Sequence, residues 1–250
     1  MTKKIAVAGK GGTGKTTFTA LLIRELVKKN KGSILAVDAD PNSNLNEALG
    51  IEVEESIADI LDEVKGSATI PTGMSKDVFV EYRLSQVLQE SKEVDLLVMG
   101  IPQGSGCYCF PNDLMRKYLG SLKDNYDYIV MDNEAGMEHL SRKVITDIDV
   151  LFVISDSSAR SVRSAARVHD IVKTIGISVG QIYLVITKTM EEGIDALNVE
   201  IAKTGLELIG IVPYDPALVK FDLESKPLAE LPDESLAVKA MDEILAKAGV

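Results

Sequence analysis

Eight consecutive residues near the start of the chain constrain its fold more than any other segment. The pattern G-x-x-x-x-G-K-[ST] is met by Gly9, Lys10, Gly11, Gly12, Thr13, Gly14, Lys15 and Thr16. An apolar run, residues 5–8, precedes them directly, and a helical pattern begins near Thr17. Glycines allow a backbone to wrap a phosphate chain with its N–H groups inward, and the helix adds the positive end of its dipole. The segment therefore predicts a strand, a phosphate-binding loop and a helix in that order.

The pattern also assigns roles to two side chains. Lys15 is expected to reach the β- and γ-phosphates of a nucleotide, and the Thr16 hydroxyl is expected to bind Mg²⁺. The alternative is a glycine-rich turn that binds no ligand. Such a turn does not explain why a strand precedes the segment and a helix follows it. We therefore expect residues 9–17 to bind a nucleotide.

Composition and charge narrow the class of protein. A chain of 250 residues with 46% hydrophobic residues can bury the core of one α/β domain, so we expect residues 1–250 to form a single domain. The net charge of −11 argues against a surface that binds nucleic acid. No apolar run approaches the roughly 20 residues of a membrane span, and residues 236–248 carry charges of both signs. We expect a cytoplasmic protein with neither a nucleic-acid nor a membrane partner.

Short apolar runs alternate with amphipathic stretches along the chain. We expect strands at residues 5–8, 34–37, 96–99, 128–131, 150–154, 182–186 and 208–212. We expect helices at residues 16–29, 44–49, 57–64, 112–122, 160–175, 195–204 and 236–248. Residues 65–84 are interpreted as an insertion that could add an edge strand at 78–80. This alternation predicts an α/β fold: a mostly parallel central sheet of about seven or eight strands, with helices on both faces and ligands at the carboxyl ends of the strands.

Three acids follow predicted strands in an order that suits nucleotide hydrolysis. Asp38 and Asp40 come at the end of the second strand, and Asp132 ends the apolar run at 129–131. An acid in the position of Asp132 is expected to hold Mg²⁺ through water, and Gly136 could offer the γ-phosphate a backbone N–H. Acids at strand ends also cap helices or face solvent. Three of them in sequence after a phosphate loop favour an ATPase.

The two cysteines of the chain are separated by one residue, in the stretch Gly-Ser-Gly-Cys-Tyr-Cys-Phe-Pro-Asn at 104–112. A disulfide between Cys107 and Cys109 would be strained, and a helix beginning after Pro111 would favour their thiolate forms. Two thiolates leave a soft metal half-coordinated, whereas a dimer brings four together on its two-fold axis. The alternative, two small buried residues, suits a glycine-rich polar loop poorly.

The loop Gly-Lys-Gly-Gly-x-Gly-Lys-Thr-Thr resembles the deviant phosphate loop of the MinD/ParA/nitrogenase-iron-protein class. The resemblance implies that Lys10 crosses to the phosphates of a partner subunit, so that ATP binds a face-to-face homodimer. It also implies that Asp40 orients or activates the water and that Asp38 and Asp132 support Mg²⁺. The Asp-Pro-Asn turn at 40–42 and the region after Asp132 resemble two switches that rearrange on hydrolysis.

The residues expected to contact the base depart partly from that class. Class members carry Asn before Lys or Arg after the sixth strand, where this chain has Thr187 and Lys188. A guanine reader would need Asp in place of Met190, so the sequence favours ATP over GTP. After the seventh strand, Pro213, Tyr214 and Asp215 resemble the loop of the class that packs on adenine. The alternative is an ordinary turn built on Pro213 and Pro216.

A more specific resemblance comes from combining three motifs. The deviant loop, Gly-x-Gly-Cys-x-Cys at 104–109 and Asp-x-x-Ala-Gly-x-Glu-His at 132–139 are similar to the carbon monoxide dehydrogenase accessory ATPases, the CooC family and its relative AcsF. This resemblance implies an ATP-dependent maturation factor in which Cys107 and Cys109 of two subunits bind Ni²⁺ or Zn²⁺. Its client would be carbon monoxide dehydrogenase or acetyl-CoA synthase. His139 could couple nucleotide to metal or simply start a helix.

Two other functions stay open at this stage. Four thiolates suit a [4Fe–4S] cluster as well as a single metal ion, so an Fe–S scaffold or carrier is an alternative. A positioning or partition ATPase uses the same loop but predicts a basic face or a basic terminal helix, which this acidic chain lacks. Such an ATPase also leaves the cysteine pair without a role.

Overall fold

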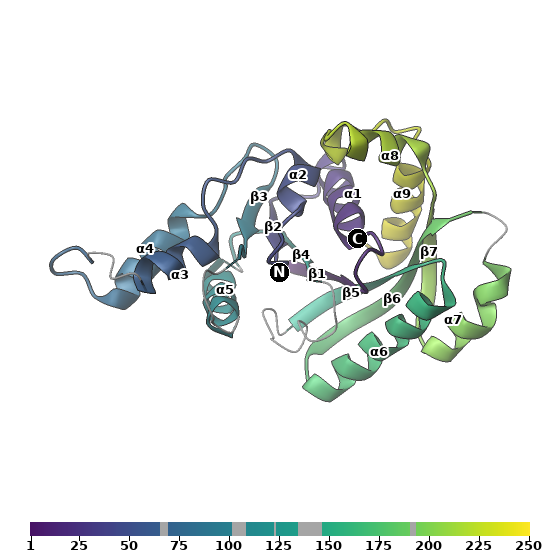
Figure 1. The fold of residues 1–250 in the computed structure, drawn as a ribbon, viewed down its shortest axis with the longest axis horizontal. Helices are drawn as coiled ribbons and strands as arrows, with labels where there is room; N and C mark the ends of the chain where they lie inside the picture. The colour runs from purple at the N-terminus through teal and green to yellow at the C-terminus, as the bar shows by residue number, and fades with distance from the viewer. Residues whose placement is uncertain (66–69, 102–108, 123, 135–146, 191–193) are drawn as a thin grey trace.

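A computed structural model describes residues 1–65, 70–101, 109–122, 124–134, 147–190 and 194–250 (Figure 1). Among them, seven strands form one sheet in the order β3-β2-β4-β1-β5-β6-β7, and every neighbouring pair is parallel. The strands are β1 (Lys3–Gly9), β2 (Ile34–Asp38), β3 (Asp95–Val98), β4 (Tyr128–Asp132), β5 (Asp147–Asp156), β6 (Ser178–Thr189) and β7 (Glu207–Pro213). The predicted parallel sheet is confirmed, and all of its carboxyl ends meet at one edge.

Helices cover both faces of this sheet. They are α1 (Lys15–Lys28), α2 (Leu45–Leu49), α3 (Ile57–Lys65), α4 (Lys76–Gln86), α5 (Cys109–Leu122), α6 (Ala159–Ile175), α7 (Asn198–Thr204), α8 (Pro216–Leu223) and α9 (Leu236–Ala248), with 3₁₀ turns η3 (Asp195–Leu197) and η4 (Leu228–Glu230). In Figure 1, α1, α8 and α9 lie above the sheet, and α5, α6 and α7 lie below it. Each expected helix is present, most of them within one residue of the predicted bounds.

The two faces of the sheet belong to separate hydrophobic cores. In β1, Ile5 and Val7 pack with α1 and α9, whereas Ala6 and Ala8 pack with the core that includes α5 and α6. Side chains of a strand point alternately to its two faces, so a strand covered on both sides must be apolar throughout. This double burial explains why the predicted strands lack an apolar–polar alternation.

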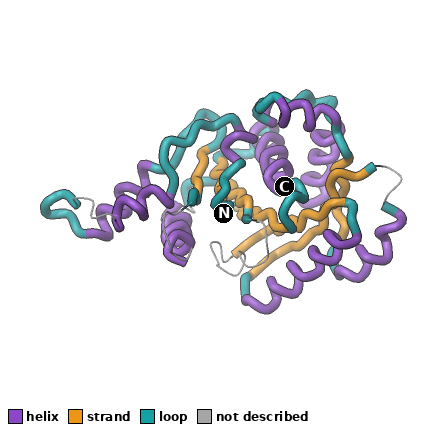
Figure 2. The backbone as a smooth tube through the Cα atoms, in the orientation of Figure 1, coloured by secondary structure: helices purple, strands orange, loops and turns teal. Residues whose placement is uncertain are grey.

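The segment after α3 departs from the sequence prediction. Residues 78–80 were expected as a possible edge strand, but they lie in α4, which starts after Ser75. The Ser75 hydroxyl accepts a hydrogen bond from the N–H of Val78. Val80 packs against the core, and the buried Leu84 and Val87 follow it at helical spacings of four and three. This N-cap and core packing outweigh the β-propensity of two valines. Figure 2 shows α3 and α4 projecting from the left end of the sheet.

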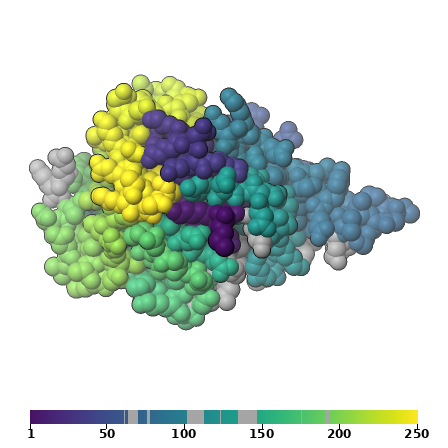
Figure 3. Space-filling model, turned by 180° about the vertical axis from the view of Figure 1, so that it is seen from behind, coloured from purple at the N-terminus to yellow at the C-terminus, as the bar shows by residue number. Residues whose placement is uncertain are grey.

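The C-terminal segment closes over the first helix. Arg24 of α1 donates hydrogen bonds to the carbonyl oxygen of Leu231 at 2.6 Å and to the carboxylate of Asp233 at 2.7 Å. The side chain of Lys3 also donates to the carbonyl of Gly249. In Figure 3 the yellow C-terminal residues lie directly against the purple residues of the N-terminal part. These contacts hold α1, whose N-terminus follows the phosphate loop, against the C-terminal segment.

Candidate nucleotide-binding site

The phosphate-binding pattern lies between β1 and α1, as predicted. Strand β1 ends at Gly9 and α1 begins at Lys15, so the loop comprises residues 10–14. A Cβ atom on Gly9 would lie 2.3 Å from the carbonyl oxygen of Ile154 in β5, so only glycine fits there. Gly14 has a left-handed φ of 87°, and no described side chain caps α1. The N–H groups of its first turn are therefore available to an anion.

The two lysines of the loop have different surroundings. Lys15 is buried, and burial lowers its pKa, although the nearby charges of Asp132, Asp40 and Glu134 oppose that shift. The Lys15 ammonium group thus lies beside the phosphate loop, where it could form an ion pair with a phosphate group. Lys10 is exposed, and the side chain of Thr13 donates to the Lys10 carbonyl at 2.8 Å. A contact from Lys10 to a partner subunit stays a prediction.

Thr16 and Asp132 meet across the gap between α1 and β4. The Thr16 hydroxyl donates a hydrogen bond of 2.6 Å to one carboxylate oxygen of Asp132, and Thr19 lies 3.4 Å from the other. Asp132 is 1% exposed, and burial raises its pKa to about 7, although the bond from Thr16 opposes the shift. A cation near this carboxylate would favour its charged form.

This pair fits a magnesium ion that is bound partly through water. Mg²⁺ prefers hard oxygen ligands and keeps several waters and phosphate oxygens, so it needs only one or two protein side chains. The described residues hold no cluster of three or more His, Cys, Asp or Glu side chains suited to a metal. A hydroxyl and a carboxylate next to the phosphate loop therefore suit a nucleotide-bound Mg²⁺ better than a metal held by protein alone.

Asp38 anchors the turn that carries Asp40. The Asp38 carboxylate is fully buried, and its two oxygens accept the N–H groups of Asp40 and Leu45, each at 3.0 Å. Burial raises the pKa of Asp38 to about 6, and these backbone hydrogen bonds oppose the shift. Asp40 accepts the N–H of Asn42 at 2.9 Å and is only partly buried. One buried side chain thus ties the start of the Asp-Pro-Asn turn to the start of α2, while support of Mg²⁺ by Asp38 stays a prediction.

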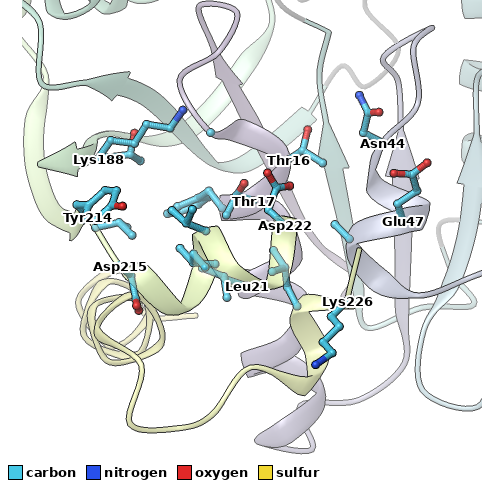
Figure 4. Close-up of a pocket in the computed structure, with 18 of the residues that line it drawn as sticks. Thr16, Thr17, Leu21, Asn44, Glu47, Lys188, Tyr214, Asp215, Asp222 and Lys226 are labelled. Atoms are coloured by element: carbon cyan, nitrogen blue, oxygen red, sulfur yellow. The ribbon is translucent and has the colours of Figure 1, made fainter. Parts of the chain in front are cut away.

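The residues expected around the base line one cavity of about 600 Å³ beside the loop (Figure 4). Those from the ends of β6 and β7 are Thr187, Lys188, Pro213, Tyr214 and Asp215, and the phosphate-loop side contributes Gly14, Thr16 and Thr17. The Tyr214 ring is 46% exposed and so is available to a flat ligand. Because the phosphate loop opens into the same cavity, a nucleotide with its phosphates on the loop would have its base near these residues.

Asp215 has a structural task that the sequence did not indicate. One carboxylate oxygen accepts the N–H of Ala217 at 2.8 Å and the other accepts the N–H of Ala237 at 3.0 Å, besides a hydrogen bond from the Ser235 hydroxyl. It therefore caps both α8 and α9. The predicted turn at Pro213 and Pro216 leads directly into α8, with Pro216 at its first position.

Sequence reasoning missed part of the cavity wall. Asn44 and Glu47 come from the segment just after the Asp-Pro-Asn turn, and Asp222 and Lys226 come from the segment after Asp215. Recognising α8 from the Asp-Pro start would have found Asp222, whereas Lys226 lies beyond the end of that helix. Thr19 was missed as well, although its spacing of three from Thr16 places both hydroxyls on one helical face.

Several predicted residues lie outside the described part of the chain. These are Cys107, the glycines at 104 and 106, Gly136 and His139. Cys109 is the first residue of α5, which therefore starts three residues before the predicted helix. Pro111 falls in the first turn, where its missing N–H costs no helical hydrogen bond.

A parallel sheet, a glycine loop between the first strand and helix, and acids at two neighbouring strand ends define a P-loop nucleotide-binding protein. A family model described as the CobQ/CobB/MinD/ParA nucleotide binding domain matches residues 4–228, and the chain belongs to this family. It is a P-loop ATPase of that family, for which ATP and Mg²⁺ are the expected ligands. One solved relative, MinD of Pyrococcus horikoshii, is a complex with Mg-ADP.

Individual relatives give a finer picture. An uncharacterised ATP-binding protein of Methanocaldococcus jannaschii is 43% identical over 246 residues, covering 97% of each chain. The carbon monoxide dehydrogenase accessory protein CooC of Rhodospirillum rubrum is 30% identical over 231 residues, covering 88% of this chain and 86% of CooC. The solved MinD of Pyrococcus furiosus has a TM-score of 0.70 at 22% identity, covering 100% and 99%, which shows the shared fold.

None of the described helices is both long and apolar enough to cross a bilayer.

Proposed function

We propose that this ATPase is a metallochaperone that assists nickel insertion into carbon monoxide dehydrogenase or acetyl-CoA synthase. The observation that carries the proposal is the similarity to CooC along most of both chains, together with the Cys-x-Cys sequence at 107–109. Ni²⁺ or Zn²⁺ would be the cargo, and ATP binding and hydrolysis would drive its uptake and release. The single domain 1–250 and a cytoplasmic location are part of the same proposal.

The position of Cys109 supports a metal-binding role. It begins α5, the helix that follows β3, so it comes after the carboxyl end of a strand in the parallel sheet. A helix N-terminus lowers the pKa of a nearby thiol and favours the thiolate that binds metal. Two cysteines from each of two copies would supply the four thiolates of a tetrahedral site. A homodimer is therefore the proposed metal-binding form.

Backbone hydrogen bonds join the end of β2, on the nucleotide side, to Met99 after β3 and to α3. The N–H of Met99, just after β3, donates to the carbonyl of Asp38 at 2.9 Å, and the Met99 carbonyl accepts from Ala58 at 2.9 Å. The side chain of Asp38 in turn holds the turn with Asp40. A rearrangement of that turn on hydrolysis would therefore reach the segment that leads into the cysteine pair.

The test is a metal titration of the reduced protein under anaerobic conditions. Ni²⁺ and Zn²⁺ are titrated without nucleotide, with ADP and with ATP, and the oligomer size is followed by light scattering. We expect about one metal ion per two chains, bound together with dimerisation, and a metal affinity that depends on the nucleotide. The variant C107S/C109S should lose metal binding while it still binds ATP.

Lys15→Ala is the matched control for the titrations that contain ADP or ATP. It should retain the cysteine-dependent metal site and lose the effect of ATP on that site. Undiminished Ni²⁺ and Zn²⁺ uptake by C107S/C109S would remove the metal assignment. Brown protein with visible absorption after anaerobic purification would favour the Fe–S alternative, in which the same four thiolates hold a cluster. An ATP- and nickel-saturated monomer would contradict the dimeric site.

A further inference from the structure

Two side chains at the end of β6 hold two successive carbonyl groups of the phosphate loop. The Thr187 hydroxyl donates to the carbonyl oxygen of Thr13 at 2.6 Å, and the Lys188 ammonium donates to that of Gly12 at 2.8 Å. In Figure 4 the Lys188 side chain extends from the end of β6 toward the loop that precedes α1. These contacts span more than 170 positions of sequence, so the fold and not the local chain brings them together.

Holding these carbonyls fixes the direction of the neighbouring N–H groups. In a planar trans peptide the C=O of one residue and the N–H of the next point in opposite directions. Binding the Thr13 carbonyl on the β6 side therefore turns the N–H of Gly14 away from β6. A carbonyl oxygen that faced a phosphate would repel it, whereas an N–H attracts it. At the peptide between Thr13 and Gly14, the donor from β6 thus selects the orientation that suits an anion. At the peptide held by Lys188, the N–H of Thr13 donates to the carbonyl of Lys10 at 3.4 Å, so that contact fixes the shape of the loop.

The same contacts commit the only proton of the Thr187 hydroxyl. Its two polar neighbours are both carbonyl oxygens, that of Thr13 at 2.6 Å and that of Ser155 at 3.2 Å. A hydroxyl has a single donor, and Thr187 is 5% exposed, so the proton is used within the protein. An Asn side chain at this position would offer a base both a donor and an acceptor. Thr187 has no donor left for the base.

The backbone of Lys188 adopts a conformation that its tertiary contacts must stabilise. Its φ is +55°, in the left-handed region that residues other than glycine rarely adopt. Such conformations persist where the surrounding structure determines them, and they are common at functional sites. Here the neighbouring contacts include the bond from Lys188 to the loop and that from the N–H of Tyr214 to the carbonyl of Thr189.

We propose that Thr187 and Lys188 are positioning residues for the phosphate loop and that they serve the phosphate chain, not the base. Their donors orient the peptide groups at Gly12 and Thr13 before a nucleotide arrives, which lowers the cost of ordering the loop on binding. This proposal rests on nucleotide binding by the loop and is independent of the proposed metal cargo. It follows that any base preference comes from the walls of the cavity beyond Thr187.

The test compares ligands that share phosphates and differ in the base. Binding of ATP, GTP and inorganic tripolyphosphate is measured by calorimetry for the native protein and for T187V, T187S and K188M. T187V removes one oriented donor, so the affinity for each of the three ligands should fall by a similar factor, about tenfold. T187S keeps the hydroxyl and should restore most of the affinity. K188M, altered at an exposed side chain, should weaken all three by about three- to tenfold.

Y214A is the matched control on the base side of the cavity. It should lower the affinity for ATP and GTP and leave the affinity for tripolyphosphate unchanged, because a stacked ring contacts only the base. A loss confined to ATP in T187V, with GTP and tripolyphosphate unaffected, would overturn the proposal and make Thr187 a base reader. Equal binding by native protein, T187V and K188M would also overturn it. If T187V fails to fold, K188M decides: an equal loss for all three ligands supports the proposal, and native binding overturns it. A native protein that binds no nucleotide would contradict the nucleotide site itself.

Discussion

The Thr16 hydroxyl donates a 2.6 Å hydrogen bond to the Asp132 carboxylate, which links the start of α1 to the end of β4. The bond directs the buried carboxylate at the phosphate loop. Burial raises the pKa of Asp132 to about 7, and the bond from Thr16 opposes this shift. Both groups offer oxygen atoms of the kind that Mg²⁺ prefers. The pairing therefore makes Asp132 the side chain whose charge should matter most to the divalent ion.

We predict that D132N will lower Mg²⁺-dependent ATP hydrolysis by about 100-fold or more. The amide oxygen of Asn can still accept the bond from Thr16, so the fold should be retained while the negative charge is lost. The measurement is the hydrolysis rate as a function of Mg²⁺ concentration at saturating ATP. ATP binding without Mg²⁺ should change little.

T19V is the control for this substitution. Thr19 is buried and lies 3.4 Å from the second oxygen of Asp132. Valine removes this contact and the 2.9 Å hydrogen bond from Thr19 to the Lys15 carbonyl, but it keeps the carboxylate. Its Mg²⁺ dependence should match that of the native protein. If D132N followed the native Mg²⁺ curve, the assignment of Asp132 to the divalent ion would be wrong.

A second prediction separates the two possible tasks of Asp38. D38N keeps one oxygen that can accept the N–H of Asp40 or of Leu45, but it places an amide donor against the other N–H. The turn should loosen, and the hydrolysis rate should fall about 10- to 100-fold because Asp40 is misplaced. The Mg²⁺ concentration for half-maximal rate should stay the same. A raised half-maximal concentration would instead indicate that Asp38 supports Mg²⁺, as the family resemblance implies.

The sequence predicted the sheet and the phosphate loop well because both depend on local patterns. Residues such as Val37 and Val130 lie in apolar runs that only a strand buried on two faces explains. Likewise, the glycines at 9 and 14 followed by Lys15 form a pattern that a phosphate-binding loop requires. Such constraints act over a few neighbouring residues, and one sequence is enough to recognise them.

Long-range contacts could not be predicted in the same way. The bonds from Thr187 and Lys188 to the loop depend on β6 lying two strands from β1, which no spacing in the sequence specifies. The double cap by Asp215 joins two helices separated by η4. The α4 segment was misjudged because Val78 and Val80 favour strands locally, while the burial of Leu84 and Val87 at helical spacing from Val80 favours the helix.

Gly9 offers a test of the close approach between β1 and β5. In G9A the new Cβ would meet the backbone carbonyl oxygen of Ile154 at 2.3 Å, and a backbone atom cannot move aside as a side chain can. We expect a loss of about 1–3 kcal/mol or more in the free energy of unfolding and weaker ATP binding. Urea unfolding and calorimetry measure the two effects.

Gly120 is the matched control because it lies in α5 and a Cβ there would have no neighbour within 4 Å. G120A should leave ATP binding unchanged and stabilise the protein by up to about 1 kcal/mol. Should G9A unfold and bind ATP like the native protein, the contact between Gly9 and Ile154 would not limit the loop.

The last prediction concerns the double cap at Asp215. Burial raises the pKa of this carboxyl, but the hydrogen bonds from Ser235, Ala237 and Ala217 outweigh it, so the net pKa is lowered. A carboxyl with a lowered native pKa binds fewer protons in the folded state than in the unfolded state. Its stabilisation is therefore present above about pH 4 and is lost as the pH falls through the native pKa.

We expect D215N to unfold about 1–3 kcal/mol more easily at pH 7, because its amide nitrogen would face the donors at the start of α9. The difference in unfolding free energy between native protein and D215N should shrink below about pH 4, where the carboxyl of the unfolded chain takes up a proton before that of the native protein does. S235A removes one donor to Asp215 and the long N-cap hydrogen bond from the N–H of Val238, but it keeps the charge of Asp215. It should therefore retain the pH dependence. Urea unfolding at pH 7 and pH 3 measures both terms, and a difference that stayed constant across this range would assign the cost to packing and not to the charge of Asp215.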